Sequence, residues 1–225
     1  MVAVGETLTA EIKEINFLKK QFYFTAIMTD VAVLLFEDFE TLDVFGPVEI
    51  LGRLTDLYNI HFYSLPGGLI KNKHGVSIDT QKLETVNAGA GIFLIPGGYG
   101  TRAEVNNAAL IDAIRQIATQ SKYVFTVCTG TSLLAMTGLL DGRRATTNKR
   151  AFDWVMSTGK NVHWIKQARW VVDGKYYTSS GVSAGMDMTL GFLNDIHGNE
   201  FAKKIAFEIE YTWQQDKDHD EFWDQ

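Results

Sequence analysis

The chain has only one cysteine, Cys128, among its 225 residues. It therefore cannot form an internal disulfide, which is typical of proteins in a reducing compartment, and we expect a cytoplasmic location. Long apolar runs are also absent, so we expect no membrane-spanning helix. Residues 1–30 lack the continuous apolar segment of a signal peptide, because Lys19 and Lys20 interrupt it.

Positive charge is scarce as well. The 21 Lys and Arg residues are outnumbered by 27 Asp and Glu residues, which gives a net charge of −6. Domains that bind nucleic acids usually carry a basic surface, so this balance disfavours a nucleic-acid partner. No set of His, Cys and carboxylate residues has the spacing of metal ligands, and no Gly-rich loop is followed by the Lys-Ser/Thr pair of a phosphate-binding loop. The sequence predicts neither a metal site nor a phosphate-binding loop.

The length favours one domain, and the chain has no internal repeat, low-complexity tract or interdomain linker. We predict an N-terminal extension over 1–29, a folded domain over 30–213 and an acidic C-terminal tail over 214–225. The extension is compatible with one amphipathic helix packed on the domain or on a partner. The tail predicts a solvated run of charge, carried by Asp216, Asp218, Asp220, Glu221 and Asp224.

Apolar runs alternate with stretches of helical spacing. Apolar runs predict strands at 31–36, 92–95 and 123–127, and we also predict strands at 60–65, 76–79, 164–172 and 176–180. The helical spacing predicts helices at 42–54, 103–120, 129–137, 183–196 and 199–213. Because most of these strands are apolar on both faces, we predict an α/β fold with a mainly parallel central sheet and helices on both faces. The Asp173-Gly174 pair adds an antiparallel hairpin.

Cys128 follows an apolar strand and precedes the small residues 129–132, which permit a tight turn into a helix. A thiol at this point faces unpaired backbone N–H groups and the positive end of the helix dipole. Both favour the thiolate and can lower the pKa of a cysteine. We therefore predict that Cys128 is a nucleophile at a strand-to-helix elbow. A buried, unreactive cysteine is the alternative.

Other chemistry-bearing residues follow strands at the same predicted edge of the sheet. Asp43 is compatible with two roles, the N-cap of a helix or a carboxyl group that exchanges protons beside the thiol. Gly98, in a Gly-Gly pair, is compatible with a plain turn or with an amide that stabilises developing negative charge together with the Thr129 amide. His219 lies two residues before a glutamate, as in glutamine amidotransferase triads, but it falls in the acidic tail, which disfavours that role.

Four segments of the chain resemble the ThiJ/PfpI superfamily, the class I glutamine amidotransferase-like group with a flavodoxin-like fold. They are 31–51 (VAVLLFEDFETLDVFGPVEIL), 92–101 (IFLIPGGYGT), 124–148 (VFTVCTGTSLLAMTGLLDGRRATTN) and 168–190 (ARWVVDGKYYTSSGVSAGMDMTL). Within this group, Leu42-Asp43, residues 45–47 and residues 127–130 are most similar to the isonitrile hydratase branch. The sensory domains of AraC-type regulators share much of this pattern.

The resemblance implies a ThiJ/PfpI-like domain over 30–213, folded as a flavodoxin-like sandwich with a nucleophile elbow. It implies Cys128 as the nucleophile and Asp43 as its acidic partner. Gly98 and Thr129 would supply the anion-stabilising amides, with the Thr129 side chain near the reacting water. It also implies a homodimer that binds a small-molecule substrate and needs no cofactor.

Many relatives carry a histidine at the position of Asn148. Asparagine cannot act as a base, so this residue argues against a Cys–His mechanism of the protease or amidase type. The leading hypothesis is a cofactor-independent hydro-lyase that converts an isonitrile to an N-substituted formamide through Cys128 and Asp43. The alternatives are a glutathione-independent, glyoxalase-type activity on 2-oxoaldehydes and a non-enzymatic redox- or ligand-sensing module.

Overall fold

A computed structural model describes residues 28–87 and 89–224. The predicted amphipathic helix of the N-terminal extension lies outside the described residues. In the described ranges no helix is long and apolar enough to cross a membrane.

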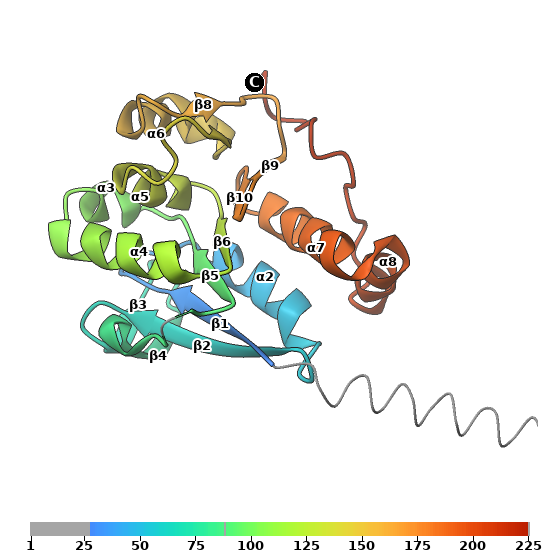
Figure 1. The fold of residues 1–225 in the computed structure, drawn as a ribbon, viewed down its shortest axis with the longest axis horizontal. Coiled ribbons are helices and arrows are strands. Elements are labelled where there is room, and N and C mark those ends of the chain that lie inside the picture. Colours follow the sequence, from blue (N-terminus) through green and yellow to red (C-terminus); the bar gives the residue numbers. More distant parts are fainter. Residues whose placement is uncertain (1–27, 88, 225) are drawn as a thin grey trace, which may run out of the picture.

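One sheet of eight strands forms the centre of the protein, in the order β3-β4-β2-β1-β5-β6-β10-β9 (Figure 1). In chain order the strands are β1 (Thr29–Leu34), β2 (Tyr58–Ser64), β3 (Gly68–Lys71), β4 (Ser77–Lys82), β5 (Ile92–Ile95), β6 (Tyr123–Thr126), β9 (Trp170–Asp173) and β10 (Tyr176–Ser179). The six inner strands pair in parallel, and only the edge strands β3 and β9 are antiparallel to their neighbours. The predicted mainly parallel α/β sheet is confirmed.

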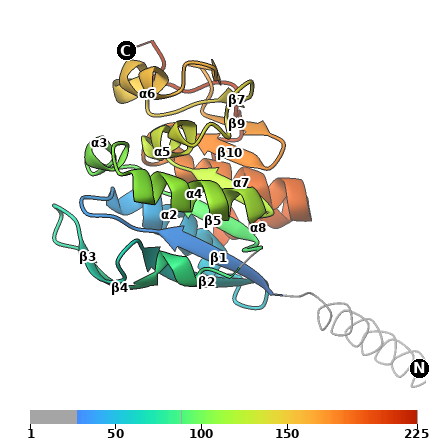
Figure 2. The same ribbon diagram turned by 60° about the vertical axis from the view of Figure 1, so that its left-hand side comes forward.

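Helices cover both faces of this sheet, as predicted (Figures 1 and 2). One face carries α2 (Thr41–Gly52), α7 (Ala184–His197) and α8 (Asn199–Glu208), and α7 contacts both of the others. The other face carries α3 (Thr101–Glu104), α4 (Ala108–Gln120) and α5 (Gly130–Met136). Between α5 and β9 the chain forms, in order, β7 (Arg144–Ala145), the 3-10 turn η2 (Lys149–Ala151), α6 (Phe152–Thr158) and β8 (His163–Trp164). Another 3-10 turn, η1 (Leu83–Thr85), follows β4.

The core lies where the inner strands are apolar on both faces. Val33 on β1, Leu94 on β5 and Phe125 on β6 have no exposed surface. Burial of a side chain of this size contributes about 1.5–3 kcal/mol. Because β1, β5 and β6 are parallel neighbours, their carboxyl ends meet at one edge, where ligand sites form in open α/β sheets.

Three predicted elements differ from the observed ones. The helix predicted over 103–120 is two helices, because Asn107 caps α4 by accepting a hydrogen bond from the Leu110 N–H at 3.3 Å. The helix predicted over 199–213 ends at Glu208, shortly before Glu210, which has φ of 52°. The strand predicted over 164–172 consists of the end of β8, a connection and part of β9.

The prediction of a solvated acidic tail is wrong for Asp220, whose side chain is completely buried. Asp220 Oδ2 lies 3.6 Å from Arg169 Nη1. Arg169 Nη2 also lies 2.6 Å from Asp187 Oδ2, so one arginine holds two carboxylates. Ion pairing of this kind compensates part of the cost of burying a charge, which the local composition of the tail could not reveal.

Candidate functional site

Cys128 lies at a sharp turn between β6 and α5. Its φ is 56°, in the left-handed region that costs a non-glycine residue roughly 1–3 kcal/mol. Two backbone contacts hold this conformation. The Cys128 N–H donates to the Ser180 carbonyl at 3.0 Å, and its carbonyl accepts from Thr147 Oγ1 at 2.7 Å. The elbow predicted from the small residues after the strand is therefore present.

Asp43 lies in the first turn of α2, with its carboxyl group completely buried. It is not the N-cap, because Glu40 occupies that position. Instead, Asp43 Oδ2 accepts a hydrogen bond from the Gly97 N–H at 2.9 Å. Asp43 Oδ1 has no hydrogen-bond partner of good geometry among the described residues. Of the two roles open from the sequence, the structure thus rules out the helix cap.

Burial raises the pKa of Asp43 well above its usual value of 3.8. The hydrogen bond from Gly97 lowers this pKa, the charge of Glu40 raises it, and the neighbouring Cys128 side chain lowers it. Desolvation is the largest of these effects, so the neutral carboxyl group is favoured. A neutral carboxyl can donate a proton, and its conjugate base is stronger than that of a solvated aspartate.

Burial likewise raises the pKa of the Cys128 thiol, and the charge of Asp43 raises it further. The N–H groups of Thr129 and Val182 act in the opposite direction. The sequence-based expectation of a lowered pKa is therefore wrong for the resting protein. Cys128 is only 7% exposed, and the desolvation of its thiol outweighs the effect of the two backbone donors on the pKa. Because each group affects the pKa of the other, Cys128 and Asp43 titrate as a coupled pair.

The glycine pair after β5, Gly97-Gly98, lies against Asp43 and Thr129. A Cβ at Gly97 would lie 2.6 Å from Thr129 N and 2.8 Å from Asp43 Oδ2, so only glycine permits this approach. The Gly98 N–H donates to Thr129 Oγ1 at 3.1 Å. Cys128, Asp43, Gly98 and Thr129 are therefore clustered. The Thr129 amide contacts the sulfur, whereas the Gly98 amide contacts the Thr129 side chain.

Val182 is a site residue that the sequence did not indicate. Its N–H is the second backbone donor to the Cys128 sulfur. Its φ is 44°, which is rare for a β-branched residue and marks local strain. Valine has no feature that signals this conformation, so only the fold could identify the contact.

Cys128 and Thr129 line a cavity of about 360 Å³. Asn148 also lines it, and its Oδ1 accepts a hydrogen bond from the Ala151 N–H at 3.0 Å. None of the five histidines lines this cavity, and His219 instead lies 4.0 Å from Glu221. No group of three or more His, Cys, Asp and Glu residues that could hold a metal ion occurs within 28–87 and 89–224. The cavity lining thus contains the Cys128 thiol and no imidazole, and Asp43, which interacts with the Cys128 side chain, is not part of that lining.

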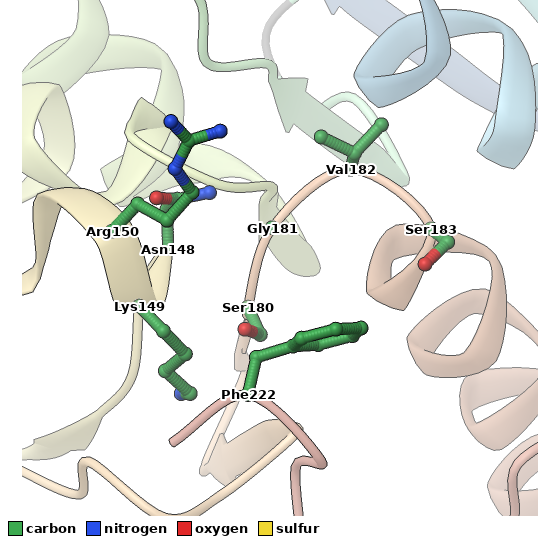
Figure 3. A pocket seen from close by; sticks show the side chains of 8 residues that line it. All are labelled: Asn148, Lys149, Arg150, Ser180, Gly181, Val182, Ser183 and Phe222. Atoms are coloured by element: carbon green, nitrogen blue, oxygen red, sulfur yellow. The ribbon is translucent and has the colours of Figure 1, made fainter. Parts of the chain in front are cut away.

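A second cavity of about 310 Å³ adjoins the first and shares Asn148, Arg150 and Val182 with it. Figure 3 shows Asn148, Lys149 and Arg150 along one side of it and the Phe222 ring on another. Phe222 follows the buried Asp220, so the anchored C-terminal segment supplies part of this wall. Burial lowers the pKa of Lys149 to about 8.

The chain is similar to a known protein family and to several characterised proteins. The family model described as "DJ-1/PfpI family" matches residues 29–195. The isonitrile hydratase of Pseudomonas putida is 29% identical over 182 residues, which cover 81% of this chain and 78% of that protein. The HTH-type transcriptional regulator CdhR of Pseudomonas aeruginosa is 30% identical over 162 residues, which cover 71% of this chain but only 47% of the regulator. The crystal structure of a ThiJ/PfpI family protein from Pseudomonas syringae is 25% identical, with a TM-score of 0.75 over 82% of this chain and 75% of that one.

Proposed function

This chain belongs to the DJ-1/PfpI family, and we propose that it hydrates an isonitrile to an N-substituted formamide at Cys128. The observation that carries this proposal is the buried carboxyl group of Asp43 next to Cys128, whose own cavity has no histidine in its lining. A carboxyl group of raised pKa can replace the imidazole as the proton carrier for the thiol. The similarity to an isonitrile hydratase supports the choice of electrophile.

In the first step the sulfur of Cys128 forms a bond to the terminal isonitrile carbon, R–N≡C. The Asp43 carboxyl group donates its proton to the same carbon, and the thiol proton passes to the resulting Asp43 carboxylate. The product is a thioimidate, R–N=CH–S–Cys. The N–H groups of Thr129 and Val182 stabilise negative charge on the sulfur during this step.

In the second step water attacks the thioimidate carbon. Asp43 donates its proton to the substrate nitrogen and accepts one from the attacking water; the C–S bond then breaks, and the proton of the added hydroxyl group passes to the sulfur. The formamide R–NH–CHO leaves, and the thiol regains its proton. The raised basicity of the Asp43 carboxylate suits both transfers, and general acid–base catalysis of this kind contributes roughly 10²- to 10⁴-fold in rate.

The decisive assay measures formamide production from cyclohexyl isocyanide. We expect formation by the wild type and none above background by Cys128→Ala. The variant must show the same cooperative urea unfolding as the wild type, because alanine also has to adopt the strained φ at this position. Equal formamide production by the wild type and by folded Cys128→Ala would show that Cys128 does not catalyse this reaction.

A sensing role is the second candidate, favoured by the similarity to the regulator CdhR. This chain spans about half the length of that regulator. Mass measurement after mild peroxide treatment tests a redox-sensing form, since Cys128 is the only thiol and its oxidation to the sulfinate adds two oxygen atoms. Lactate formation from methylglyoxal without glutathione would instead support the 2-oxoaldehyde activity.

The family resemblance also supports a homodimer in the cytoplasm that acts without a cofactor. The molecular mass in solution, measured by light scattering, tests the dimer. A monomer that retains formamide production would contradict it.

A further inference from the structure

Positive charge is concentrated at the cavity that contains Cys128, although the whole chain carries a net charge of −6. Lys73 follows β3, Arg102 lies in α3, and Arg150 lies in η2, so three separate segments bring cations to one rim. Glu40 is the acidic residue that lines the same cavity, and its Oε1 lies 3.8 Å from His74 Nδ1. Positive charge therefore exceeds negative charge at the entrance.

Arg102 is held in position by neutral groups. Its Nη1 donates to the Gly98 carbonyl at 3.2 Å and to Thr101 Oγ1 at 3.3 Å. Its guanidinium carbon lies 4.4 Å from the centre of the Trp154 ring and 5.4 Å from that of Tyr99. These contacts orient the guanidinium group but leave its charge uncompensated.

Lys73 is placed in the same way, with its Nζ 4.2 Å from the centre of the Tyr99 ring. Within 28–87 and 89–224, neither Lys73 nor Arg102 forms an ion pair with a carboxylate. Both cations therefore contact the ring of Tyr99, a residue of the cavity lining that is 67% exposed. An oriented arginine beside a lysine matches the geometry of a carboxylate ligand.

From this arrangement we propose that the substrate of the Cys128 site carries a carboxylate, which Arg102 and Lys73 bind while the electrophilic carbon reaches the sulfur. The inference rests on the proposed function for the identity of the electrophile, which becomes a carboxylate-bearing isonitrile such as isocyanoacetate. The cations would also raise the local concentration of such a substrate.

Alkylation of Cys128 tests the anion site without requiring the proposed reaction. Iodoacetate and iodoacetamide both form an S–CH₂ bond and release iodide, and they differ in charge. Cys128 is the only cysteine, so the measured rate belongs to this thiol alone. The ratio of the two rates cancels any change in thiol reactivity that a substitution causes.

We expect the iodoacetate-to-iodoacetamide rate ratio to fall roughly threefold or more in Arg102→Gln and in Lys73→Gln, and further in the double variant. Arg53→Gln is the matched control, because Arg53 is exposed, follows α2 and pairs with Glu49 away from the cavity. Its ratio should equal that of the wild type. An unchanged ratio in both folded rim variants would overturn the inference.

Hydration of isocyanoacetate and of its methyl ester then separates the two proposals. Faster hydration of the acid, lost in Arg102→Gln, supports both. Equal hydration of acid and ester, with an unchanged alkylation ratio, overturns the anion site and leaves the proposed function intact. No hydration of either isonitrile, with a reduced alkylation ratio in the rim variants, overturns the proposed function and supports the anion site.

Discussion

Asp43 and Gly97 are joined by a hydrogen bond of 2.9 Å between the Asp43 carboxyl oxygen and the Gly97 backbone N–H. Asp43 lies on α2, and Gly97 lies in the turn after β5, 54 residues further along the chain. The bond fixes one carboxyl oxygen and leaves the other without a partner of good geometry in the described structure. It thereby orients the carboxyl group beside the thiol of Cys128.

Gly97→Ala should reduce formamide production strongly, because a Cβ would lie 2.7 Å from Thr129 Oγ1 and 2.8 Å from Asp43 Oδ2. Overpacking of this kind also costs about 1–3 kcal/mol of stability. Gly52→Ala is the matched control, since its Cβ would meet only Ile60 Cδ1 at 3.6 Å. Kinetics and urea unfolding of both variants check this. Wild-type activity in Gly97→Ala would show that the site does not need the close approach of the residue 97 backbone to Asp43 and Thr129.

Asp43→Asn should lower the hydration rate by about 10²- to 10⁴-fold, because asparagine cannot carry the proton. The same change should stabilise the folded protein at neutral pH. The folded state binds the Asp43 proton more tightly than the unfolded state does. The contribution of this group to the free energy of unfolding is therefore fully present below pH 3.8, and it is lost as the pH rises through the raised pKa of the folded state.

Urea unfolding across a pH series measures this effect. The stability advantage of Asp43→Asn over the wild type should be largest at neutral pH and should shrink as pH falls toward 3.8. An advantage that does not depend on pH would show that the pKa of Asp43 is not raised by folding.

The pH dependence of Cys128 alkylation by iodoacetamide should follow the raised pKa of the thiol. We expect the rate to keep increasing with pH beyond 9.0, the ordinary pKa of cysteine, because only the thiolate reacts. Asp43→Asn removes one cause of the shift and should make the thiol react faster at neutral pH. If the alkylation rate of the wild type instead stopped increasing well below pH 9.0, Cys128 would be the stabilised thiolate that its position at a helix N-terminus alone predicts.

Asp187→Ala should destabilise the protein by about 3–5 kcal/mol, because it removes a carboxylate from the buried Arg169 guanidinium. It should also loosen the C-terminal segment, since Asp187 Oδ1 accepts from the Gln214 N–H at 2.9 Å. Lys203→Ala, which breaks an exposed ion pair with Glu200, is the control and should change the urea midpoint little. Similar effects of the two substitutions would show that the buried pair is not structurally important.

Local patterns in the sequence determined much of this protein. Apolar runs predicted the central strands β1, β5 and β6, since strands covered on both faces are apolar along most of their length. The small residues after Cys128 predicted the elbow, because a tight turn into a helix depends on neighbouring residues. The family resemblance selected Asp43, Gly98 and Thr129, and the structure brings all three to Cys128.

The pKa values of Cys128 and Asp43, in contrast, depend on the tertiary structure. Helix-end electrostatics act over one turn and favoured a thiolate, but burial by distant segments raises the pKa of Cys128 and of Asp43. The contact of Val182 with the sulfur and the burial of Asp220 by Arg169 likewise join residues far apart in the chain. Desolvation and long-range pairing depend on what the whole fold packs around a group, and no local pattern of residues contains that information.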